Sequence, residues 1–382
     1  MDPKLEFTHC NRPTVGVELE LQLVEQNSWA LNPVILDVLK LLPDEQEWAK
    51  PELMQSYIEI NSSAFLHVRE VISDLKSKLA IVDALVKQLD TRIFWAATHP
   101  FSTWMEQRIT PDKRYKQLVD KMQDTARRIV TFGMHVHVGV DSGDKAVMVI
   151  DRLMRHLPTL LALSVNSPFW VGRNTGLQSH RCKIMEQLPA AGLPPNMRNY
   201  SEYCWIVNHS IQSGFINSIR EIWWDVRPHP RLGTVEVRIC DLPPDMETVS
   251  MLTALIQCLV VALSEQIDEG VYQYDIHPIM VKQNKWKATR YGMNAEMTDA
   301  VTQKAVPVRI LAYELYEKLI PYSKQLGCEA ELNLLPGILQ KPSGARRQLE
   351  SFQKHGNFPD MIQELVETQI IEAVPLLSRQ GK

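Results

Sequence analysis

Cysteine is scarce in this chain of 382 residues, and its spacing excludes several classes of protein. The six cysteines stand at positions 10, 182, 204, 240, 258 and 328, and no two of them form a CxxC pair. Such spacing gives neither a disulfide framework nor a tight zinc-binding motif. We therefore expect reduced thiols, a cytoplasmic location and no structural zinc site.

An excess of charge of one sign is also missing. The chain has 41 lysines and arginines against 45 aspartates and glutamates, a net charge of -4, with the two signs interspersed. Proteins that bind nucleic acid or membrane surfaces usually carry a concentrated basic patch. The composition therefore predicts small-molecule partners and favours neither nucleic acid nor membrane.

The sequence shows no long uninterrupted apolar run. Residues 1–7 contain no apolar segment behind a basic start, so we expect no signal peptide. The longest apolar run, around residues 259–263, falls short of the roughly 20 apolar residues that a membrane span needs. We expect no membrane-spanning segment.

The familiar motifs for nucleotides and nucleophiles are missing too. The sequence has no GxxxxGK[ST] phosphate loop, no GxGxxG after a predicted strand and no GxSxG turn. A nucleotide would therefore have to be bound by another kind of site, and the periodicity of the sequence alone does not show that a nucleotide is bound.

What the chain does contain is four separated stretches in which apolar residues alternate with glutamate, histidine or arginine. A strand directs successive side chains to opposite faces, so each stretch would gather its charged residues on one face of a sheet. The stretches are residues 14–21, with Glu18 and Glu20; 57–61, with Glu59 and Asn61; 133–140, with His135 and His137; and 233–240, with Glu236 and Arg238.

Such a charged face needs a cation to offset the repulsion between its carboxylates. Glu18 and Glu20 are two residues apart on a strand, which separates their Cα atoms by about 6.5 Å. This distance suits two neighbouring metal ions or one bridged ion. Magnesium prefers oxygen ligands, and manganese also accepts imidazole. The alternative for either glutamate is a solvated strand face, but the agreement of four strands favours metal.

The pair His135 and His137 allows other interpretations. Two histidines on one strand face occur in zinc hydrolases, but such an enzyme would need further histidines or an aspartate, and the companions here are glutamates and arginine. A structural role for one of the two histidines is the other alternative.

Arginines near these stretches are candidates for binding phosphate or carboxylate. A guanidinium holds such oxygens in a bidentate manner, which suits Arg238 and Arg227; the alternative is a salt bridge to the neighbouring glutamates. Arg173 and Arg181 belong to a polar segment, residues 166–181, that could reach the site or be a solvated loop. We expect Cys240 to be a small buried filler.

The remaining segments indicate helices around the strands. Apolar residues at helical spacing predict a helix over residues 67–89, and residues 246–267 predict a buried helix with Asp245 as its N-cap. A short strand is expected at 93–97, and a helix pair or a helix kinked at Pro158 at 145–165. From about residue 298 the pattern is helical, with breaks expected near Pro321, Pro336, Pro342 and Pro359.

Strands dispersed among long helices favour an α+β fold, with helices packed on one face of a mostly antiparallel sheet. No repeat, low-complexity run or linker divides the chain. We therefore expect a single catalytic domain over residues 1–382.

Several motifs together resemble the glutamate-cysteine ligase type 2 family, especially its YbdK-like carboxylate-amine ligases. They follow the family's order over about residues 14 to 330, and the combination is highly specific. The motifs are Gly16-Val-Glu-Leu-Glu20, Glu52 with Tyr57-Ile-Glu-Ile60, Thr98-His-Pro-Phe101, Phe132-Gly-Met-His-Val-His-Val-Gly139, Trp224-Asp-Val-Arg-Pro228, Gly233-Thr-Val-Glu-Val-Arg238 and Arg290-Tyr-Gly292.

The resemblance implies a glutamine-synthetase-like fold: a curved antiparallel sheet with helices on its convex face and the active site on its concave face. It implies ATP and two or three Mg²⁺ or Mn²⁺ ions. Arg238 and Arg227 would hold the transferring phosphoryl group, and Arg173 and Arg181 would lie near the substrate carboxylates. The metal ligands would be Glu18, Glu20, Glu52, Glu59, His135 and Glu236, which leaves His137 in second rank.

The resemblance also implies a reaction. ATP would phosphorylate a carboxylate, most simply the side chain of glutamate, and cysteine or another amine would displace the phosphate to form an amide. Phosphoryl transfer depends mainly on positioning and charge neutralisation, which suits Arg238, Arg227 and Glu59 as the catalytic residues. A mobile segment over 166–181 would shield the acyl phosphate from water. Family likeness suggests a homodimer.

Two alternatives keep the same charged face. One is a phosphagen-kinase-like phosphotransferase, and the other is a non-catalytic sensor of metal and nucleotide, although a pure binder has no need of such a costly buried cluster. One departure from the family concerns substrate size, because Phe94-Trp-Ala-Ala97 replaces the glycines that relatives often carry before the Thr-His-Pro turn. This bulk would narrow one end of the pocket.

Overall fold

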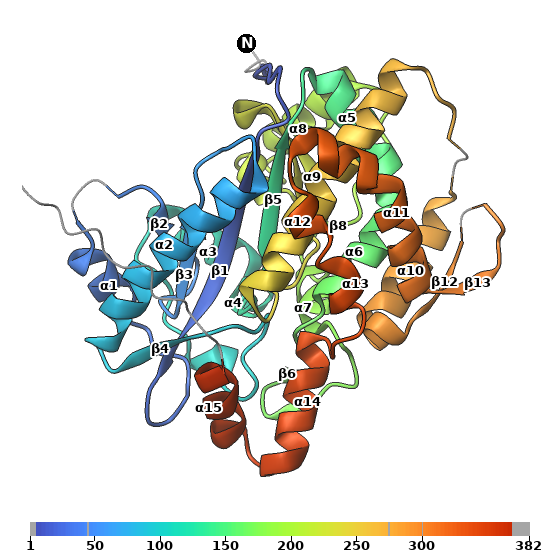
Figure 1. Ribbon diagram of the computed structural model, residues 1–382. Helices are drawn as coiled ribbons and strands as arrows, with labels where there is room; N and C mark the ends of the chain where they lie inside the picture. Colours follow the sequence, from blue (N-terminus) through green and yellow to red (C-terminus); the bar gives the residue numbers. More distant parts are fainter. Residues whose placement is uncertain (1–4, 44–45, 274–275, 300, 369–382) are drawn as a thin grey trace, which may run out of the picture.

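The computed structural model describes residues 5–43, 46–273, 276–299 and 301–368. Its centre is an antiparallel sheet, seven-stranded in this described part of the chain, with strand order β10-β11-β5-β1-β3-β2 and with β4 paired to the far end of β1 (Figure 1). The strands are β1 Val15–Glu25, β2 Ala49–Lys50, β3 Tyr57–Asn61, β4 Thr91–Phe94, β5 Met134–Gly139, β10 Val226–His229 and β11 Thr234–Val237.

The long strand β1 organises this sheet, because β3, β4 and β5 all pair with it. One face of β1 is aliphatic: Val15, Val17, Leu19 and Leu21 are at most 1% exposed. The residues between them, Glu18 and Glu20 among them, point to the other face, as the alternation predicts. All four stretches identified in the sequence therefore form neighbouring strands.

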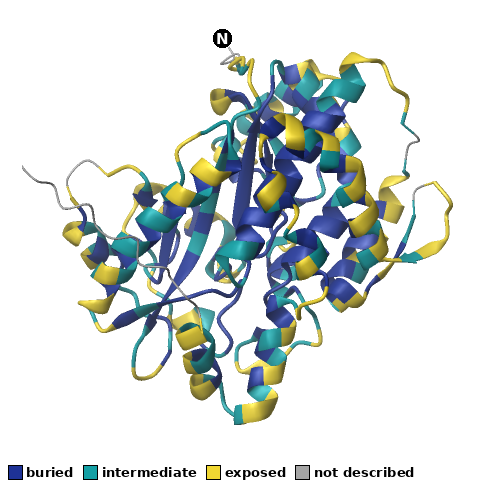
Figure 2. Cartoon of the chain, in the orientation of Figure 1, coloured by how far each residue is buried: buried dark blue, intermediate teal, exposed yellow. Residues whose placement is uncertain are grey.

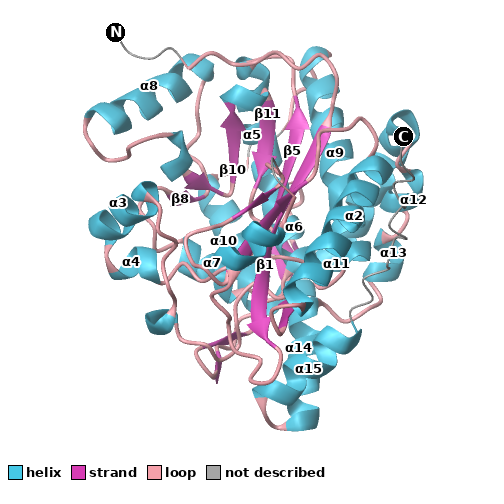
Figure 3. Cartoon of the chain, turned by 90° about the vertical axis from the view of Figure 1, so that its left-hand side faces the viewer, coloured by secondary structure: helices cyan, strands magenta, loops and turns pink. Residues whose placement is uncertain are grey.

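Helices α2, α5 and α9 cover the aliphatic face. In Figure 3, α2, α9 and α11 lie on one side of the strands, and α3, α4 and α8 lie on the other. The helices are α1 Ile35–Leu41, α2 Val68–Lys87, α3 Lys113–Met122, α4 Asp124–Arg127, α5 Gly143–Leu153, α6 Leu157–Ser164, α7 His180–Met185, α8 Tyr200–Gln212, α9 Met246–Asp268, α10 Pro278–Tyr291, α11 Val308–Leu326, α12 Glu329–Leu332, α13 Leu335–Ile338, α14 Gly344–His355 and α15 Phe358–Thr368.

The predicted helices α2 and α9 are confirmed, and the burial shown in Figure 2 explains their sequence patterns. Helix α2 buries one stripe against β1, β3 and β4, so its apolar residues follow helical spacing. Helix α9 lies between the sheet and a second helical layer of α11 and α12, which leaves it apolar nearly all round. The main hydrophobic core extends over both layers, from Val15 to Ile362.

Helix α9 corrects the expectation that no segment is long enough to span a membrane. It has 23 residues, and its most apolar window has a mean hydropathy of 1.8, so by length and composition alone it could cross one. In this structure 89% of that window is buried inside the protein. The helix therefore serves as the central core helix of the fold.

One of the proline expectations was wrong, because Pro321 lies inside α11 instead of ending it. The breaks near Pro336 and Pro359 are confirmed: α13 and α15 begin beside these prolines, which stand in their first turns, where an N–H has no partner in the helix. The helix pair expected around Pro158 is also confirmed, since a 3-10 turn at Met154–His156 separates α5 from α6. The break near Pro342 is confirmed, since α13 ends and α14 begins around it.

Three small two-stranded sheets were not foreseen, since their strands are too short to show a period. They pair β6 Phe169–Trp170 with β7 Arg173–Asn174, β8 Ala191–Gly192 with β9 Trp223–Trp224, and β12 Glu296–Thr298 with β13 Ala305–Pro307.

The N-cap of α9 gives a test of this fold. The Asp245 carboxylate accepts the Thr248 N–H at 2.9 Å and pairs with Arg347 at 2.8 Å. We expect Asp245→Ala to lower the free energy of unfolding by about 1–2 kcal/mol. Asp245→Asn keeps a capping oxygen, so its loss should stay below about 1 kcal/mol. Urea unfolding followed by tryptophan fluorescence measures both; an equal loss in the two variants would assign the stabilisation to the Arg347 pair instead.

Candidate active site

The face of the sheet opposite α2 and α9 gathers the charged residues predicted from the four alternating stretches. Strand pairing sets their order, because residues of the same parity on neighbouring strands project side by side. The cross-strand partners are Glu18 with Asn61 and with His135, Glu20 with Glu59, and His137 with Gly16 and with Glu236.

Glu18 stands between the two histidines. One of its oxygens lies 3.0 Å from His135 Nδ1 and the other lies 3.4 Å from His137 Nε2. Burial opposes ionisation of Glu18, but hydrogen bonds from both imidazoles outweigh it and hold its pKa well below the ordinary value. Glu18 is therefore a buried anion at neutral pH.

Glu236 is held by two arginines. Arg227 donates from Nε to Oε2 at 2.7 Å and from Nη2 to Oε1 at 3.2 Å, and Arg238 donates to the same Oε1. Burial disfavours the carboxylate, yet Arg227 and Arg238 together keep its pKa well below the ordinary value. The Arg227 Nη1 group also donates to the carbonyls of Ile219 and Ile222. The salt bridge considered for Arg227 is thus present, and this guanidinium serves to hold Glu236.

Glu20, Glu52 and Glu59 form the other half of the cluster. Burial raises the pKa of Glu52, and the charge of Glu20 raises it further. Burial likewise raises the pKa of Glu59 well above its ordinary value, with Glu18 and Glu52 adding repulsion. The Asn61 amide donates to Glu59 at 2.9 Å, and Lys50 Nζ lies 3.9 Å from Glu59. The pKa values of Glu52 and Glu59 remain raised, so the positive charge around these carboxyls does not offset their burial and mutual repulsion.

The histidines supply the observation that tests for metal. Nε2 of His135 and Nε2 of His137 are both buried without a hydrogen-bond partner, although each has a carboxylate nearby. Donor atoms of Glu18, His137 and Glu236 lie within 4.8 Å of one another, close enough to share one ion. An orphaned imidazole nitrogen beside carboxylates fits a divalent cation such as Mn²⁺ or Mg²⁺.

This trio revises the ranking of the two histidines. His137, left in second rank by the sequence, belongs to the trio because strand register sets it opposite Glu236. His135 lies between Glu18 and Glu20, and its Nδ1 is 3.4 Å from Arg238 Nη1. Burial and Arg238 lower the pKa of His135, which keeps the ring neutral and able to ligate a cation.

Arg181 reaches the same face through a glycine. It is 5% exposed, and it donates to the carbonyls of Arg238 and Ile239, both at 3.3 Å. Gly133 has the parity of His135, and a Cβ added there would lie 2.2 Å from Arg181 Nη2. Only glycine therefore leaves room for this guanidinium beside Glu20, whose carboxylate accepts the Gly133 N–H at 2.5 Å.

Arg173, by contrast, is exposed on the β6–β7 hairpin, and this hairpin is fixed to the Thr98-His-Pro turn by the Gly172 N–H to Pro100 carbonyl bond. The structure thus separates Arg173 from Arg181, although the sequence grouped them. Much of segment 166–181 is buried: Ser167 and Ser179 both donate to Asp241, which lies 4.0 Å from Arg181. The segment is therefore a loop, as expected, but its ends are anchored, so it is not solvated along its whole length.

Cys240 is fully buried, and burial raises its pKa to about 12, so its thiol is a packing group as expected.

A small cavity beside Glu52 was missed by the sequence. It measures about 70 Å³ and has an apolar floor with charged groups at its edges. The Tyr115 hydroxyl lies 3.4 Å from a Glu52 oxygen and so marks where the cavity meets the cluster. The lining residues are Glu52, Leu53, Arg114, Tyr115, Leu118, Ile129, Arg220, Glu221 and Trp223.

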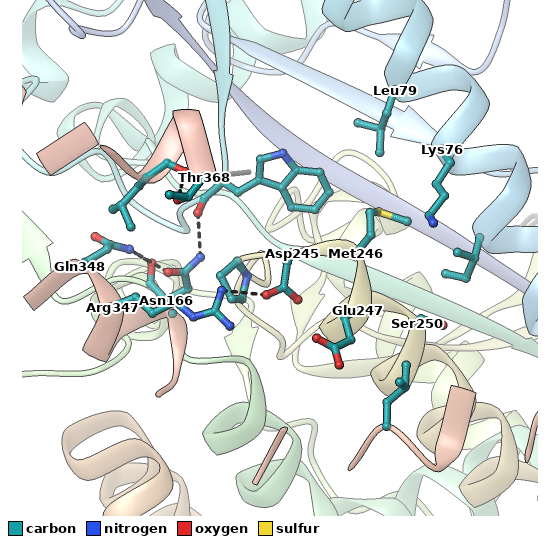
Figure 4. A pocket seen from close by; sticks show the side chains of 16 residues that line it. Lys76, Leu79, Asn166, Asp245, Met246, Glu247, Ser250, Arg347, Gln348 and Thr368 are labelled. Atoms are coloured by element: carbon teal, nitrogen blue, oxygen red, sulfur yellow. Dashed lines mark hydrogen bonds and ion pairs between the residues drawn. The ribbon is translucent and has the colours of Figure 1, made fainter. Parts of the chain in front are cut away.

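A larger cavity of about 550 Å³ lies away from this chemistry, among the helices on the aliphatic side of the sheet (Figure 4). Leu79 of α2, Met246 of α9 and Gln348 of α14 line it, and Asp245 and Arg347 pair across it. Trp95 lines this cavity too, so its bulk fills space behind the sheet. The bulk expected from residues 94–97 to narrow one end of the substrate pocket therefore lies, for Trp95, against this other cavity.

Comparisons with known proteins agree with the arrangement. The family model "Glutamate-cysteine ligase family 2 (GCS2)" matches residues 14–367. A protein of Gloeobacter violaceus named "Putative glutamate--cysteine ligase 2" is 39% identical over 364 residues, 94% of this chain and 98% of that protein. A protein of the same name from Thermobifida fusca is 38% identical over 367 residues, 95% of this chain and 92% of its own.

Solved structures show the same fold at low sequence identity. A glutamate-cysteine ligase of Francisella tularensis in complex with AMP superposes with a TM-score of 0.66 at 13% identity, over 97% of this chain and 91% of that one. A bifunctional glutathione synthetase of Pasteurella multocida also gives 0.66 at 12% identity, over 93% of this chain, which spans about half (52%) of that protein. The glutamine-synthetase-like α+β fold is thereby confirmed. The chain belongs to glutamate-cysteine ligase family 2, a family of ATP-dependent ligases that join a carboxylate to an amine.

Proposed function

We propose that this protein phosphorylates the side-chain carboxylate of glutamate with ATP and joins it to cysteine or a similar small amine. The observation that carries the proposal is the buried cluster of glutamates and partnerless imidazole nitrogens beside Arg238. Such a cluster fits divalent metal and phosphate, and it has no use in a hydrolase that works through a nucleophilic side chain.

The residues proposed to hold metal are those of the cluster, namely Glu18, Glu20, Glu52, Glu59, His135 and Glu236, with His137 added because of its place beside Glu18 and Glu236. Bound Mg²⁺ or Mn²⁺ would neutralise phosphate charge and orient the nucleotide. Glu59 is proposed as the most sensitive of the ligands, because its environment most strongly disfavours an uncompensated charge.

Arg238 is proposed to contact the transferring phosphoryl group. It is steadied by Glu236 and lies beside His135, on the charged face itself. Arg227 acts behind it, by fixing Glu236 in a bidentate pair. Arg181 is proposed to bind a substrate carboxylate, since its Nε is buried without a partner next to Gly133. We propose that Arg173 lies at the outer edge of the site.

The chemistry balances without a protein nucleophile. A carboxylate oxygen of glutamate attacks the γ-phosphorus of ATP, and the bond to the β–γ bridging oxygen breaks, which gives ADP and an acyl phosphate. The amine nitrogen then attacks the acyl carbon, phosphate leaves with the bonding electron pair, and the nitrogen loses a proton to water. The protein's tasks are to hold the phosphate oxygens and to exclude water from the acyl phosphate.

The cavity beside Glu52 is proposed as the place of the amine substrate. Its apolar part, formed by Leu53, Leu118 and Ile129, suits a short thiol or alkyl side chain, and its volume of about 70 Å³ favours a small one.

We further propose that residues 1–382 act as one catalytic domain, that the protein is cytoplasmic, and that it forms a homodimer.

The reaction itself is the first test. With Mg²⁺, ATP, glutamate and cysteine, we expect ADP and orthophosphate to appear in equal amounts, and both to depend on glutamate. A coupled ADP assay and a phosphate assay follow the two products, with a panel of small amines in place of cysteine. ADP without orthophosphate would favour a kinase of the phosphagen type, and no ADP with any amine would contradict the ligase proposal.

The metal ligands are tested by removing one charge at a time. Glu59→Gln keeps the size of the side chain but loses a ligand, so kcat for ADP release should fall at least 100-fold, in line with the loss of a principal electrostatic contact. Manganese binding measured by paramagnetic resonance should weaken in parallel. The matched control is Glu25→Gln at the end of the same sheet, where the carboxylate only caps a turn. Equal manganese binding in wild type and Glu59→Gln would contradict the assignment.

The place of Arg181 is tested through Gly133. A methyl group in Gly133→Ala would meet Arg181 Nη2 at 2.2 Å, so the guanidinium must move. We expect KM for glutamate to rise about tenfold, the size of losing roughly one charged hydrogen bond. Gly16→Ala lies on the same face, where a new Cβ meets only Ser62 Oγ at 3.8 Å, and KM should change less than threefold. A similar KM in both variants would remove Arg181 from the substrate site.

A further inference from the structure

One buried ammonium group lies outside the metal cluster and is not used by the chemistry above. Lys285, on α10, is 2% exposed, yet it carries its charge between two carboxylates. Its Nζ lies 2.5 Å from Asp225 and 2.8 Å from Glu186. Burial disfavours this charge, but the Asp225 carboxylate outweighs the effect and the pKa of Lys285 is raised. A permanently charged lysine at such depth needs a reason.

Asp225 connects Lys285 to two of the arginines. It stands at the bend between β9 and β10, two residues before Arg227, so that both side chains have the same parity. Its N–H donates to the Gly192 carbonyl at 2.7 Å, and its carbonyl accepts the Arg238 N–H at 2.8 Å. The position of Asp225 therefore fixes the start of the strand that carries Arg227 and the backbone of Arg238.

Glu186 connects Lys285 to the third arginine. It ends α7, the short helix that carries Arg181 in its first turn. The start of the same helix is also tied to α10, because the Thr289 carbonyl accepts the N–H groups of Gln178 and Ser179 at 2.8 and 3.1 Å. Helix α10 thus holds α7 near both ends, and Lys285 supplies the charged contact at the far end.

We infer that Lys285 is a positioning residue that sets the place of Arg238 at the transferring phosphoryl group relative to Arg227, which fixes Glu236, and to Arg181 at the substrate carboxylate. The inference rests on the proposed function of these arginines. The Lys285 ammonium group contacts both Asp225, at the β9–β10 bend, and Glu186, at the end of α7. It therefore holds together the two segments on which the positions of the arginines depend. Without it, the carboxylates of Asp225 and Glu186 would lose the charge that they share and would repel each other, and the bend and α7 would separate.

The experiment compares nucleotides with and without a γ-phosphate, because Arg238 is proposed to contact that group. In the wild type with Mg²⁺, calorimetry should show tighter binding of the ATP analogue AMP-PNP than of AMP. In Lys285→Met we expect AMP-PNP to bind at least tenfold more weakly, AMP to stay within threefold, and kcat for ADP release to fall at least 30-fold. The isosteric variant Asp225→Asn should show the same pattern more weakly.

The matched control is Lys145→Met. Lys145 also bridges two carboxylates, Asp141 and Asp268, at 2.5 and 2.8 Å, but it lies on α5 on the helical side of the sheet. This variant should keep both nucleotide affinities and kcat within twofold. The double variant Asp225→Asn/Lys285→Met should be no worse than Lys285→Met alone, since both changes break the same contact.

Each outcome decides the inference. Unchanged AMP-PNP affinity and kcat in folded Lys285→Met would overturn it, and so would an equal loss for AMP, which indicates general unfolding of the site. If Lys285→Met does not fold, Asp225→Asn decides in its place: wild-type affinity for AMP-PNP would overturn the inference. If the wild type itself binds AMP-PNP no better than AMP, the proposed role of Arg238 fails instead.

Discussion

The rest of the structure depends on one constraint, the repulsion among Glu18, Glu20, Glu52, Glu59 and Glu236 on a single largely buried sheet face. Carboxylates in such a place are stable only where positive charge is fixed nearby. The aliphatic face of β1 and the core helix α9 make the sheet rigid enough to hold them together. The arginines, the histidines and the buried polar contacts behind them all serve to compensate this charge.

The positive charge that compensates these carboxylates is distributed unevenly between the two halves of the cluster. Glu236 has two arginines and Glu18 has two imidazoles, so both ionise readily. Glu52 and Glu59 are less well compensated: Lys50 stands 3.9 Å from Glu59, and Arg114 offsets the charge of Glu52 only in part. The pKa values of both are raised, by burial first and by neighbouring carboxylates second. The half of the site nearest the small cavity is therefore the half with the greatest demand for added cations.

Much of this could be predicted from the sequence, because period two in β1, β3, β5 and β11 fixes which residues share a face. The helices α2 and α9 followed from their apolar patterns for the same kind of reason. Register could not be predicted, since it depends on pairing between distant segments, and it is register that brings His137 to Glu236. Nor could the sequence separate Arg181 from Arg173, because the glycine that admits Arg181 lies about 50 residues away, at position 133.

The arginines show how the fold relates charge to geometry. Arg181 comes from a short helix, Arg227 from an edge strand and Arg238 from the residue after β11, so no single element could set their spacing. Hydrogen bonds to the backbone of Arg238 connect them instead: the Arg181 guanidinium donates to the Arg238 carbonyl, and the Arg238 N–H donates to the Asp225 carbonyl. A guanidinium moved by 1 Å loses much of its bidentate contact with a phosphate. Because the charged face of the sheet is crowded with carboxylates, this spacing is held from outside that face, by Lys285 of α10 through Asp225 and Glu186.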